Sequence, residues 1–424
     1  MMNIRRKFWD IKMKIFSLLN KDAKILYDTM KELQIPENQL YLHDDESCPC
    51  GSGKSYKDCC KGKSDDGPVN SKKPVEVLLM EEMRKGFKQD KVCLHPDQAN
   101  CKGKIKEAHA LQNHKIISLL ASADNHVIMQ DPAKQPIVIK EDPVNPILIV
   151  PFTRVSGNKA TTQSCFCDVH DTQAFKVIEA GSPDFDANND EMKFVYAYKA
   201  FVFEYANQRH LMWLFRRMFS KRPGVFSLPE QVKEYRIQCL RMEEFETVKK
   251  KFDTEILAGT HDGISTVVVT IPYKLGFANY AYIAPDYDID GNRIKSIDNK
   301  GKMHRLAITV LPEVNQSYIL MSCLDSEEEF YRSFFQSIKT ANLEKILFYF
   351  NLMLPLFSEN VILSEALWNA LDEKGQFGLT HMANLTGDDQ LKLSQTLGMA
   401  LRNAAHKKNF DYSKRMGFDL FQQV

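Results

Sequence analysis

Residues 48–60 read CPCGSGKSYKDCC, in which two pairs of cysteines lie on either side of a glycine-rich turn. Cys48 and Cys50 are separated by one residue, and Cys59 and Cys60 are adjacent. Four thiolates suit a closed tetrahedral zinc site, and the glycines of the turn let the chain reverse so that both pairs reach one ion. The stretch therefore predicts a structural zinc centre at Cys48, Cys50, Cys59 and Cys60.

The same stretch resembles the SEC-C motif, the zinc module at the C-terminus of the SecA translocase motor. The pattern of that motif is Cys-x-Cys, a Gly-Ser-Gly-Lys turn, and a final Cys followed by Cys or His. Because no ligand position is left open, the resemblance implies an accessory docking module rather than a catalytic centre. In SecA the module contacts the SecB chaperone and lipid or ribosomal surfaces. A SecB-like chaperone or the ribosome is therefore an expected partner of residues 48–60.

A second group of cysteines and histidines follows. Cys93 and Cys101 bracket LHPDQAN, and much later the sequence SCFCDVHD, residues 164–171, immediately precedes a helical pattern. A knuckle, a pair of strands and a helix that bears the last two ligands form the treble-clef arrangement. The predicted zinc ligands are Cys93, Cys101, Cys167 and His170, with Cys165 and His95 as substitutes. Two buried cysteine pairs are the alternative, since free cysteine is commonly a core residue.

Between these two clusters, Glu107-Ala108-His109 ends a short strand-like run. This sequence resembles the first His motif of HNH nucleases, a family in which zinc holds the scaffold, the His activates water and a second metal polarises the phosphate. The resemblance implies that His109 is the base, that Asn125 and His126 are metal or phosphate ligands, and that a further divalent ion such as Mg²⁺ binds. A structural zinc fold in which His109 is a noncatalytic polar residue is the alternative.

Charge is nearly balanced over the chain, with 56 Lys and Arg against 55 Asp and Glu in 424 residues. The protein is therefore not a polycation that coats nucleic acid or membranes nonspecifically. Residues 84–115, however, contain eight basic and three acidic residues, a local net charge of +5 around the second zinc site. Such a patch can neutralise phosphates, although charge runs are also common on solvated faces.

Near the C-terminus, Arg402-Asn403 followed by His406 resembles the Arg-Asn-x-x-x-His motif of HEPN ribonucleases, shortened by one residue. The resemblance implies that Arg402 stabilises charge on a phosphate and that His406 transfers a proton. A polar cluster at a helix end is the alternative.

Periodicity predicts an α+β fold. Residues 191–222 and 230–252 have the apolar spacing of helices, whereas STVVVTIPY, RLAITVLP and SYILMSCL have the β-branched alternation of strands. The predicted segments are N-terminal helices (1–40), the SEC-C module (41–64), a linker (65–75), the treble-clef unit (76–180), a helical segment (181–252), a β unit (253–325) and a helical C-terminal region (326–424).

No apolar run is long enough to span a membrane and no signal peptide is evident, so the expected location is the cytoplasm. The leading hypothesis is a zinc protein that acts on nucleic acid as an HNH-like nuclease, in the role of a toxin or phage-defence effector. The rivals are a noncatalytic adaptor that docks through its SEC-C module and a ribonuclease that uses Arg402 and His406. The sequence contains no pattern typical of dinucleotide, P-loop, serine hydrolase or zincin sites.

Overall fold

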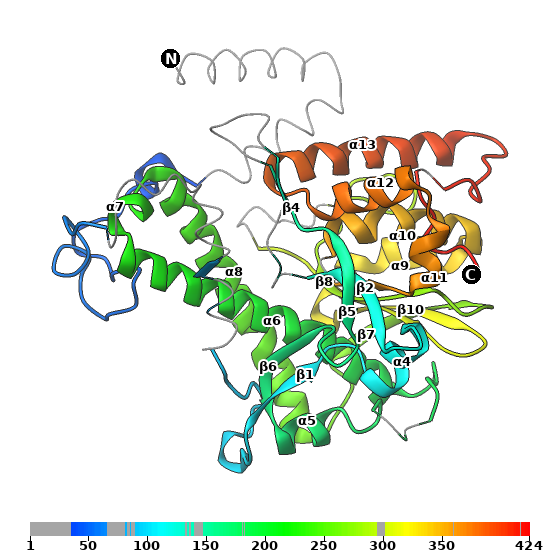
Figure 1. Cartoon of the computed structure of the whole chain (residues 1–424), viewed down its shortest axis with the longest axis horizontal. Coiled ribbons are helices and arrows are strands. Elements are labelled where there is room, and N and C mark those ends of the chain that lie inside the picture. Colours follow the sequence, from blue (N-terminus) through cyan, green and yellow to red (C-terminus); the bar gives the residue numbers. More distant parts are fainter. Residues whose placement is uncertain are drawn as a thin grey trace. The chain divides into compact units, whose positions relative to one another are not determined.

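The computed structural model divides the chain into two compact units, which are described separately. It describes residues 35–65, 81–82, 85, 90–131, 134, 137–139, 147–179, 181, 183–294, 302–358, 360–415 and 417–424 (Figure 1). One unit contains residues 35–65 and 215–240, and the other contains most of the remaining described chain. Almost all of the predicted N-terminal helices and linker lie outside the described residues.

The larger unit is built on a seven-stranded sheet with the order β5-β2-β11-β8-β9-β10-β7. Every described pairing in this sheet is antiparallel. The strands are β2 (His126–Gln130), β5 (Phe152–Ser156), β7 (Ile264–Ile271), β8 (Phe277–Ile283), β9 (Leu306–Pro312), β10 (Ser317–Leu324) and β11 (Val361–Leu363). The sheet therefore joins strands from three of the predicted segments, namely 76–180, 253–325 and 326–424.

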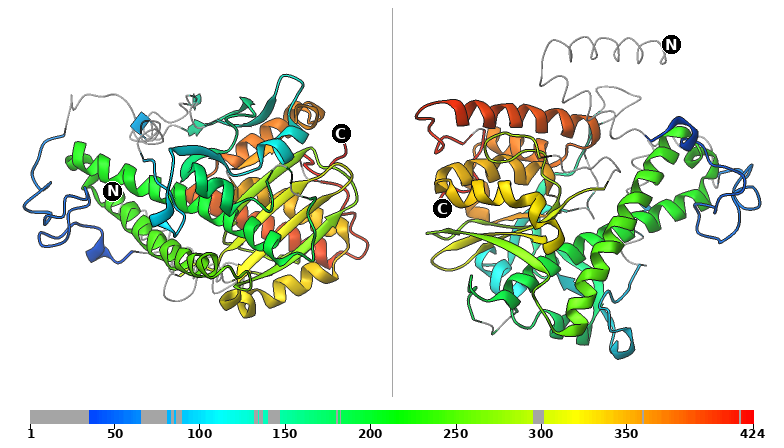
Figure 2. Two further views of the ribbon diagram at one scale, coloured as in Figure 1. Left: turned by 90° about the horizontal axis from the view of Figure 1, so that it is seen from below. Right: turned by 180° about the vertical axis from the view of Figure 1, so that it is seen from behind.

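Both faces of this sheet are buried, which explains the long β-branched and apolar runs of its central strands. In β10, Ile319, Met321 and Cys323 pack into one hydrophobic cluster, and the alternating Tyr318 and Leu320 pack into the other. Helices α9 (Glu328–Thr340) and α10 (Leu343–Phe357) cover the first face, and α13 (Gly387–His406) packs on α10 outside them (Figure 2). The second face is covered by residues 190–214 of α6 and 241–258 of α8.

The long helices follow the predicted ranges closely. Helix α6 (Asp190–Lys221) coincides with the predicted 191–222, and α8 (Pro229–Ala258) extends the predicted 230–252 by two turns at its C-terminal end. The remaining described helical segments are short: η1 (Glu37–Gln39), η2 (Gln98–Asn100), η3 (Asn113–Ile117), α4 (Ser118–Leu120), α5 (Asp168–Ala174), α7 (Pro223–Phe226), η4 (Asp325–Glu327), α11 (Glu365–Ala370) and α12 (Glu373–Ala383).

A separate two-stranded sheet, β1 (Ile105–His109) with β6 (Thr162–Cys167), bears part of the second cysteine cluster. Strand β1 pairs antiparallel with β6, and α5 begins at the next residue. A further pair consists of β3 (Ile137–Ile139) and β4 (Ile147–Ile149). The helices and mainly antiparallel sheets confirm the predicted α+β class. None of the helices described has the length and apolar character that crossing a membrane requires.

The smaller unit combines the SEC-C stretch with residues 215–240, which include the end of α6, all of α7 and the start of α8. Aromatic side chains hold this helical part together: Phe219 lies 5.7 Å from Phe226 and 5.2 Å from Tyr235 between ring centroids. The hydroxyl groups of Tyr56 and Ser227 are 2.9 Å apart and share a hydrogen bond. The zinc-type module is therefore packed on helices that lie more than 150 residues away in the sequence.

Candidate metal centres

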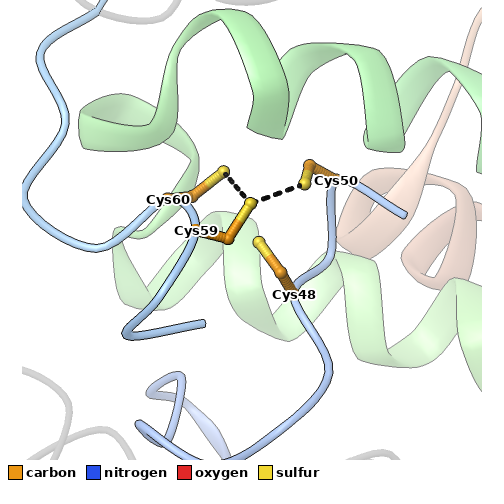
Figure 3. Close-up of side chains that lie close together, drawn as sticks. All are labelled: Cys48, Cys50, Cys59 and Cys60. Atoms are coloured by element: carbon orange, nitrogen blue, oxygen red, sulfur yellow. Dashed lines mark hydrogen bonds between the residues drawn. The ribbon is translucent and has the colours of Figure 1, made fainter. Parts of the chain in front are cut away.

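The first candidate centre consists of the four cysteines of the SEC-C stretch, whose sulfur atoms point toward one another (Figure 3). Gly51 and Gly53 both adopt φ of 76°, a left-handed conformation that side-chain-bearing residues rarely adopt. The reversed chain is closed by a hydrogen bond of 2.8 Å from the Cys48 amide to the Lys54 carbonyl. The turn thus brings the two cysteine pairs together, as the sequence predicts.

The sulfur separations fit a tetrahedral zinc ion. With Zn–S bonds of about 2.3 Å, two ligands of a regular tetrahedron are about 3.8 Å apart. Cys50 Sγ lies 3.4 Å from Cys59 Sγ, and Cys59 Sγ lies 3.8 Å from Cys60 Sγ. Soft thiolates in this geometry favour zinc over the hard ions Mg²⁺ and Ca²⁺.

Hydrogen bonding tunes one of these thiols. Burial alone would raise the pKa of the Cys50 thiol. Hydrogen bonds from the Ser52 hydroxyl and the neighbouring thiols outweigh this effect and lower the pKa to about 6. Ser52 Oγ also lies 3.1 Å from Cys59 Sγ. The sequence analysis did not single out Ser52, although its position inside the glycine turn is the signal that could have identified it.

Arginine side chains attach this module to the helices of the smaller unit. The Arg236 guanidinium donates to the Gln39 carbonyl at 2.6 Å and to Glu46 Oε2 at 2.9 Å. A Cβ placed on Gly51 would lie 3.2 Å from Arg216 Cδ, so glycine is needed there for close approach as well as for its positive φ. These contacts fix the module on one face of α8 and α6.

The second candidate centre brings Cys93, Cys101, Cys167 and His170 together in the larger unit. His170 Nδ1 lies 3.4, 3.5 and 3.4 Å from the sulfur atoms of Cys93, Cys101 and Cys167, respectively. Zn–S bonds of about 2.3 Å and Zn–N bonds of about 2.0 Å place sulfur and nitrogen ligands about 3.5 Å apart in a tetrahedron. The four side chains that the sequence predicts therefore fit a second zinc ion.

The two predicted substitute ligands lie outside this group. The His95 ring stacks on that of His170, with centroids 3.9 Å apart, and its Nδ1 accepts a hydrogen bond from the Asp97 amide at 3.2 Å. His95 therefore orients a ligand rather than completing the set. Cys165 is 2% exposed in the hydrophobic core, where burial raises its pKa well above the ordinary value. Its sulfur is not among the ligand atoms of Cys93, Cys101, Cys167 and His170 that gather within 4.8 Å of one another.

The long sequence gap between the two halves of the second candidate centre has a structural explanation. The two strands of its hairpin, β1 and β6, are separated by residues 110–161, and this insertion supplies β2 and β5 to the seven-stranded sheet. The hairpin still closes across this insertion: Ile105 pairs with Cys167 and His109 pairs with Thr162, with a shift of register between Lys106 and Ala108. The knuckle, the strand pair and α5 therefore follow the predicted order despite the insertion.

Of the three predicted catalytic residues, His109 directly precedes this insertion, and Asn125 and His126 lie within it. His109, the last residue of β1, forms a 2.9 Å hydrogen bond between its Nδ1 and the Ala160 carbonyl. Asn125 Nδ2 donates to Asn158 Oδ1 at 3.3 Å, so His109 and Asn125 both contact the loop 157–161. His126 begins β2, and its Nδ1 lies 2.9 Å from the Asp124 carbonyl.

No third set of three or more metal-ligating side chains is found among the described residues. The structure therefore lends no support to the expected Mg²⁺ site. Asn125 adopts φ of 59° in its turn, and its carbonyl accepts a hydrogen bond from the Gly157 amide at 2.8 Å. Its role as a metal or phosphate ligand stays a prediction.

The C-terminal pair lies at the end of α13. The Arg402 guanidinium donates to the Gly291 carbonyl at 3.1 Å, and His406 Nδ1 lies 3.0 Å from the Arg402 carbonyl. These contacts are those expected of a polar cluster at a helix end. The HEPN-like ribonuclease interpretation gains no support from them and stays a prediction.

Comparison with known proteins agrees with the first centre. The family described as SEC-C motif matches residues 46–61. No curated protein and no solved structure matches the chain. The chain therefore carries a SEC-C zinc-binding motif, and it holds a second Cys₃His group that also fits zinc.

Proposed function

We propose that this protein acts on nucleic acid through its second zinc unit, with His109 as the general base of phosphodiester hydrolysis. The observation that carries the proposal is the hydrogen bond between His109 Nδ1 and the Ala160 carbonyl. A carbonyl oxygen can only accept, so the neutral ring carries its proton on Nδ1. The Nε2 lone pair is then the basic position of the ring, as removal of a proton from water requires.

Burial supports the same role. The largely buried position of His109 lowers its pKa from the ordinary value. The ring is therefore neutral, and able to accept a proton, at neutral pH. In the proposed step, a water oxygen attacks phosphorus as its proton passes to Nε2. The bond from phosphorus to the leaving oxygen breaks, and that oxygen takes a proton from solvent. This step uses no metal ion besides the two candidate zinc ions.

The candidate zinc centre positions this base. Cys101 lies four residues before β1, whose last residue is His109, and Cys167 is the last residue of its partner strand β6. A zinc ion bound by both cysteines would hold the start of β1 against the end of β6, and so anchor the strand that bears His109 at its other end. Rigid support of this kind is what a general base needs to stay within reach of its water.

Exposed lysines surround this hairpin. Lys102, Lys104 and Lys106 are all exposed, and among the described residues only Lys106 of the three forms an ion pair, a 3.1 Å contact with Asp168. Surface pairs of this kind contribute little stability and exchange readily for a phosphate. The three lysines therefore provide a contact for the nucleic-acid backbone on the hairpin that bears the base.

Binding measured at increasing salt tests the proposal. We expect the full chain to bind duplex DNA or RNA with an affinity that falls steeply with salt. Replacing Lys102, Lys104 and Lys106 by Ala is expected to reduce the log–log salt slope by about 2 to 3, since each phosphate contact contributes about 0.9. The matched control replaces exposed lysines elsewhere in the same unit: Lys250, Lys339 and Lys374. Equal binding by the two triple variants, or no binding by the wild type, would contradict the proposal.

A second function, docking of a protein or ribosomal partner through the SEC-C module, is favoured by the way the module is held. Its four cysteines would fill every ligand position of a zinc ion, which leaves none open for chemistry. Arg236 holds the module through Gln39 and Glu46, whereas Lys54 and Lys57 are exposed. We expect Lys54→Glu with Lys57→Glu to abolish coprecipitation with a SecB-like chaperone or ribosomes, with zinc content unchanged. The control is Lys233→Glu in the same unit. Retention of the partner by the double variant would count against docking through this face.

A further inference from the structure

The backbone conformation of Thr161 is unusual for its residue type. Among the described residues, three other than glycine adopt a positive φ: Asn125, Thr161 and Asn409. Thr161, with φ of 57°, is the one of the three that carries a β-branched side chain, for which this left-handed region is a genuine outlier. Strain of this kind persists only where surrounding contacts hold it in place, and it is frequent at functional sites. The fold must therefore hold Thr161 in this conformation.

Two hydrogen bonds hold Thr161 against the chain that follows β1. The Ala110 amide donates to the Thr161 carbonyl at 3.0 Å, and the Leu111 amide donates to Thr161 Oγ1 at 3.3 Å. All three residues are buried. A buried amide that lacks a partner is costly, so these two bonds offset the strain of the left-handed backbone. Thr161 thereby binds the two residues that directly follow His109.

The same conformation sets the direction of the neighbouring carbonyl. In a regular antiparallel strand, the carbonyls of successive residues point to opposite sides. The Ala160 and Thr161 carbonyls instead both accept from the end of β1 and the residue after it: the first from His109 Nδ1 at 2.9 Å and the second from the Ala110 amide. Because a peptide unit is planar, φ of Thr161 determines where the Ala160 carbonyl points relative to Thr161.

We propose that Thr161 is a positioning residue for His109, a role that rests on the function proposed above: its left-handed backbone conformation sets the tautomer of the His109 ring. With φ in this region, the Ala160 carbonyl accepts from Nδ1 and leaves Nε2 unprotonated, as a base requires. With φ in the ordinary negative region, that carbonyl would turn away, and the ring would be free to carry its proton on Nε2. Nε2 would then be unable to accept a proton from water.

Two substitutions separate the backbone conformation of Thr161 from its hydroxyl group. Thr161→Gly and Thr161→Val both remove Oγ1, but glycine adopts a positive φ readily, whereas a β-branched residue does not. Nitrogen-15 NMR of the full, zinc-loaded chain with labelled histidine shows which ring nitrogen of His109 carries the proton, and the signal is assigned by its absence from His109→Ala. We expect the proton on Nδ1 in the wild type and in Thr161→Gly, and at least partly on Nε2 in Thr161→Val.

Thr161→Ser keeps the hydroxyl group and is expected to retain the wild-type tautomer. Thr161→Ala, which also lacks Oγ1 and disfavours a positive φ, replaces Thr161→Val should that variant not fold. A wild-type ring protonated on Nε2 would overturn the inference. So would a folded Thr161→Val and Thr161→Ala pair that keeps the proton on Nδ1, or a Thr161→Gly variant that loses it, since the last result would assign the effect to the hydroxyl group.

Cleavage measured on the same samples separates this inference from the proposed function. Thr161→Val is expected to lower the cleavage rate by about 10², the lower end of the contribution of a general base, with two zinc ions still bound. Thr161→Gly and Thr161→Ser are expected to keep the wild-type rate. Absence of cleavage in every sample, together with the expected tautomers, would support the control of the tautomer by Thr161 and overturn only the proposed function.

Discussion

Cys167→Ala is expected to lower bound zinc from two ions per chain to one and to reduce the free energy of unfolding by on the order of 5 kcal/mol. The reason is the position of this thiol. Cys167 ends β6 and precedes α5, and its sulfur lies 3.4 Å from His170 Nδ1. Without it, a zinc ion would lose the ligand that joins the hairpin to the helix. Elemental analysis and urea unfolding on the same samples measure the two effects.

Cys165→Ala is the matched control, since Cys165 lies two residues away on the same strand and is equally buried. We expect this variant to keep two zinc ions and to lose only the smaller free energy of a shortened core side chain, about 1 kcal/mol. His95→Ala should likewise keep both ions. Loss of zinc in the Cys165 variant but not in the Cys167 variant would show that the ligand assignment is wrong.

His109→Ala is expected to lower the rate of phosphodiester cleavage by about 10² to 10⁴, the contribution typical of a general base. Nicking of plasmid DNA and fragmentation of total RNA by the full, zinc-loaded chain measure the rate. Zinc content should stay at two ions, because His109 is not part of either four-residue group. The expected loss is therefore one of chemistry rather than of folding.

The control for this variant is His114→Ala, which removes an exposed histidine five residues further along the chain. Its cleavage rate is expected to match that of the wild type. A cleavage rate unchanged by His109→Ala would leave His109 as a structural polar residue. Absence of cleavage by the wild type would overturn the catalytic part of the proposal, while the predicted salt-dependent binding is tested separately.

The pH dependence of cleavage provides a further check on the same residue. Because burial lowers the pKa of His109, its base form persists below the ordinary histidine pKa of about 6.5. The rate is therefore expected to stay constant as pH falls through 6.5 and to decrease only in more acidic solution. A decrease that begins above pH 6.5 would indicate a different base.

Local sequence signals predicted the secondary structure and the first metal centre well. The spacing of residues 48–60 was sufficient because all four ligands and both left-handed glycines lie within thirteen residues, and the SEC-C match confirms the motif. The long helices and the β-branched strands were predicted because their periodicity reflects burial on particular faces. The α+β class followed from these elements.

The sheet order could not be predicted in the same way. Strand β11 has three residues and lies between β2 and β8, although β2 belongs to the segment 76–180 and β8 to 253–325. Short strands carry little periodicity, and pairing between distant segments depends on packing rather than on local pattern. The boundaries of the predicted segments therefore stay predictions. The sheet itself contains strands from three of these segments.

The sequence by itself determined the types and order of the candidate zinc ligands, since soft thiolates and imidazole at short spacings are a property of the chain alone. Only the tertiary structure brings these ligands together. The segment of Cys93 lies along β6, where the Leu94 amide donates to the Cys165 carbonyl at 2.9 Å, and β1 pairs with β6 across an insertion of about fifty residues. It likewise decided that the His109 ring meets the Ala160 carbonyl and that β10 is the only neighbour of β7 among the described strands. Hydrogen bonds of this kind join residues far apart in sequence, and their geometry exists only once the chain has folded.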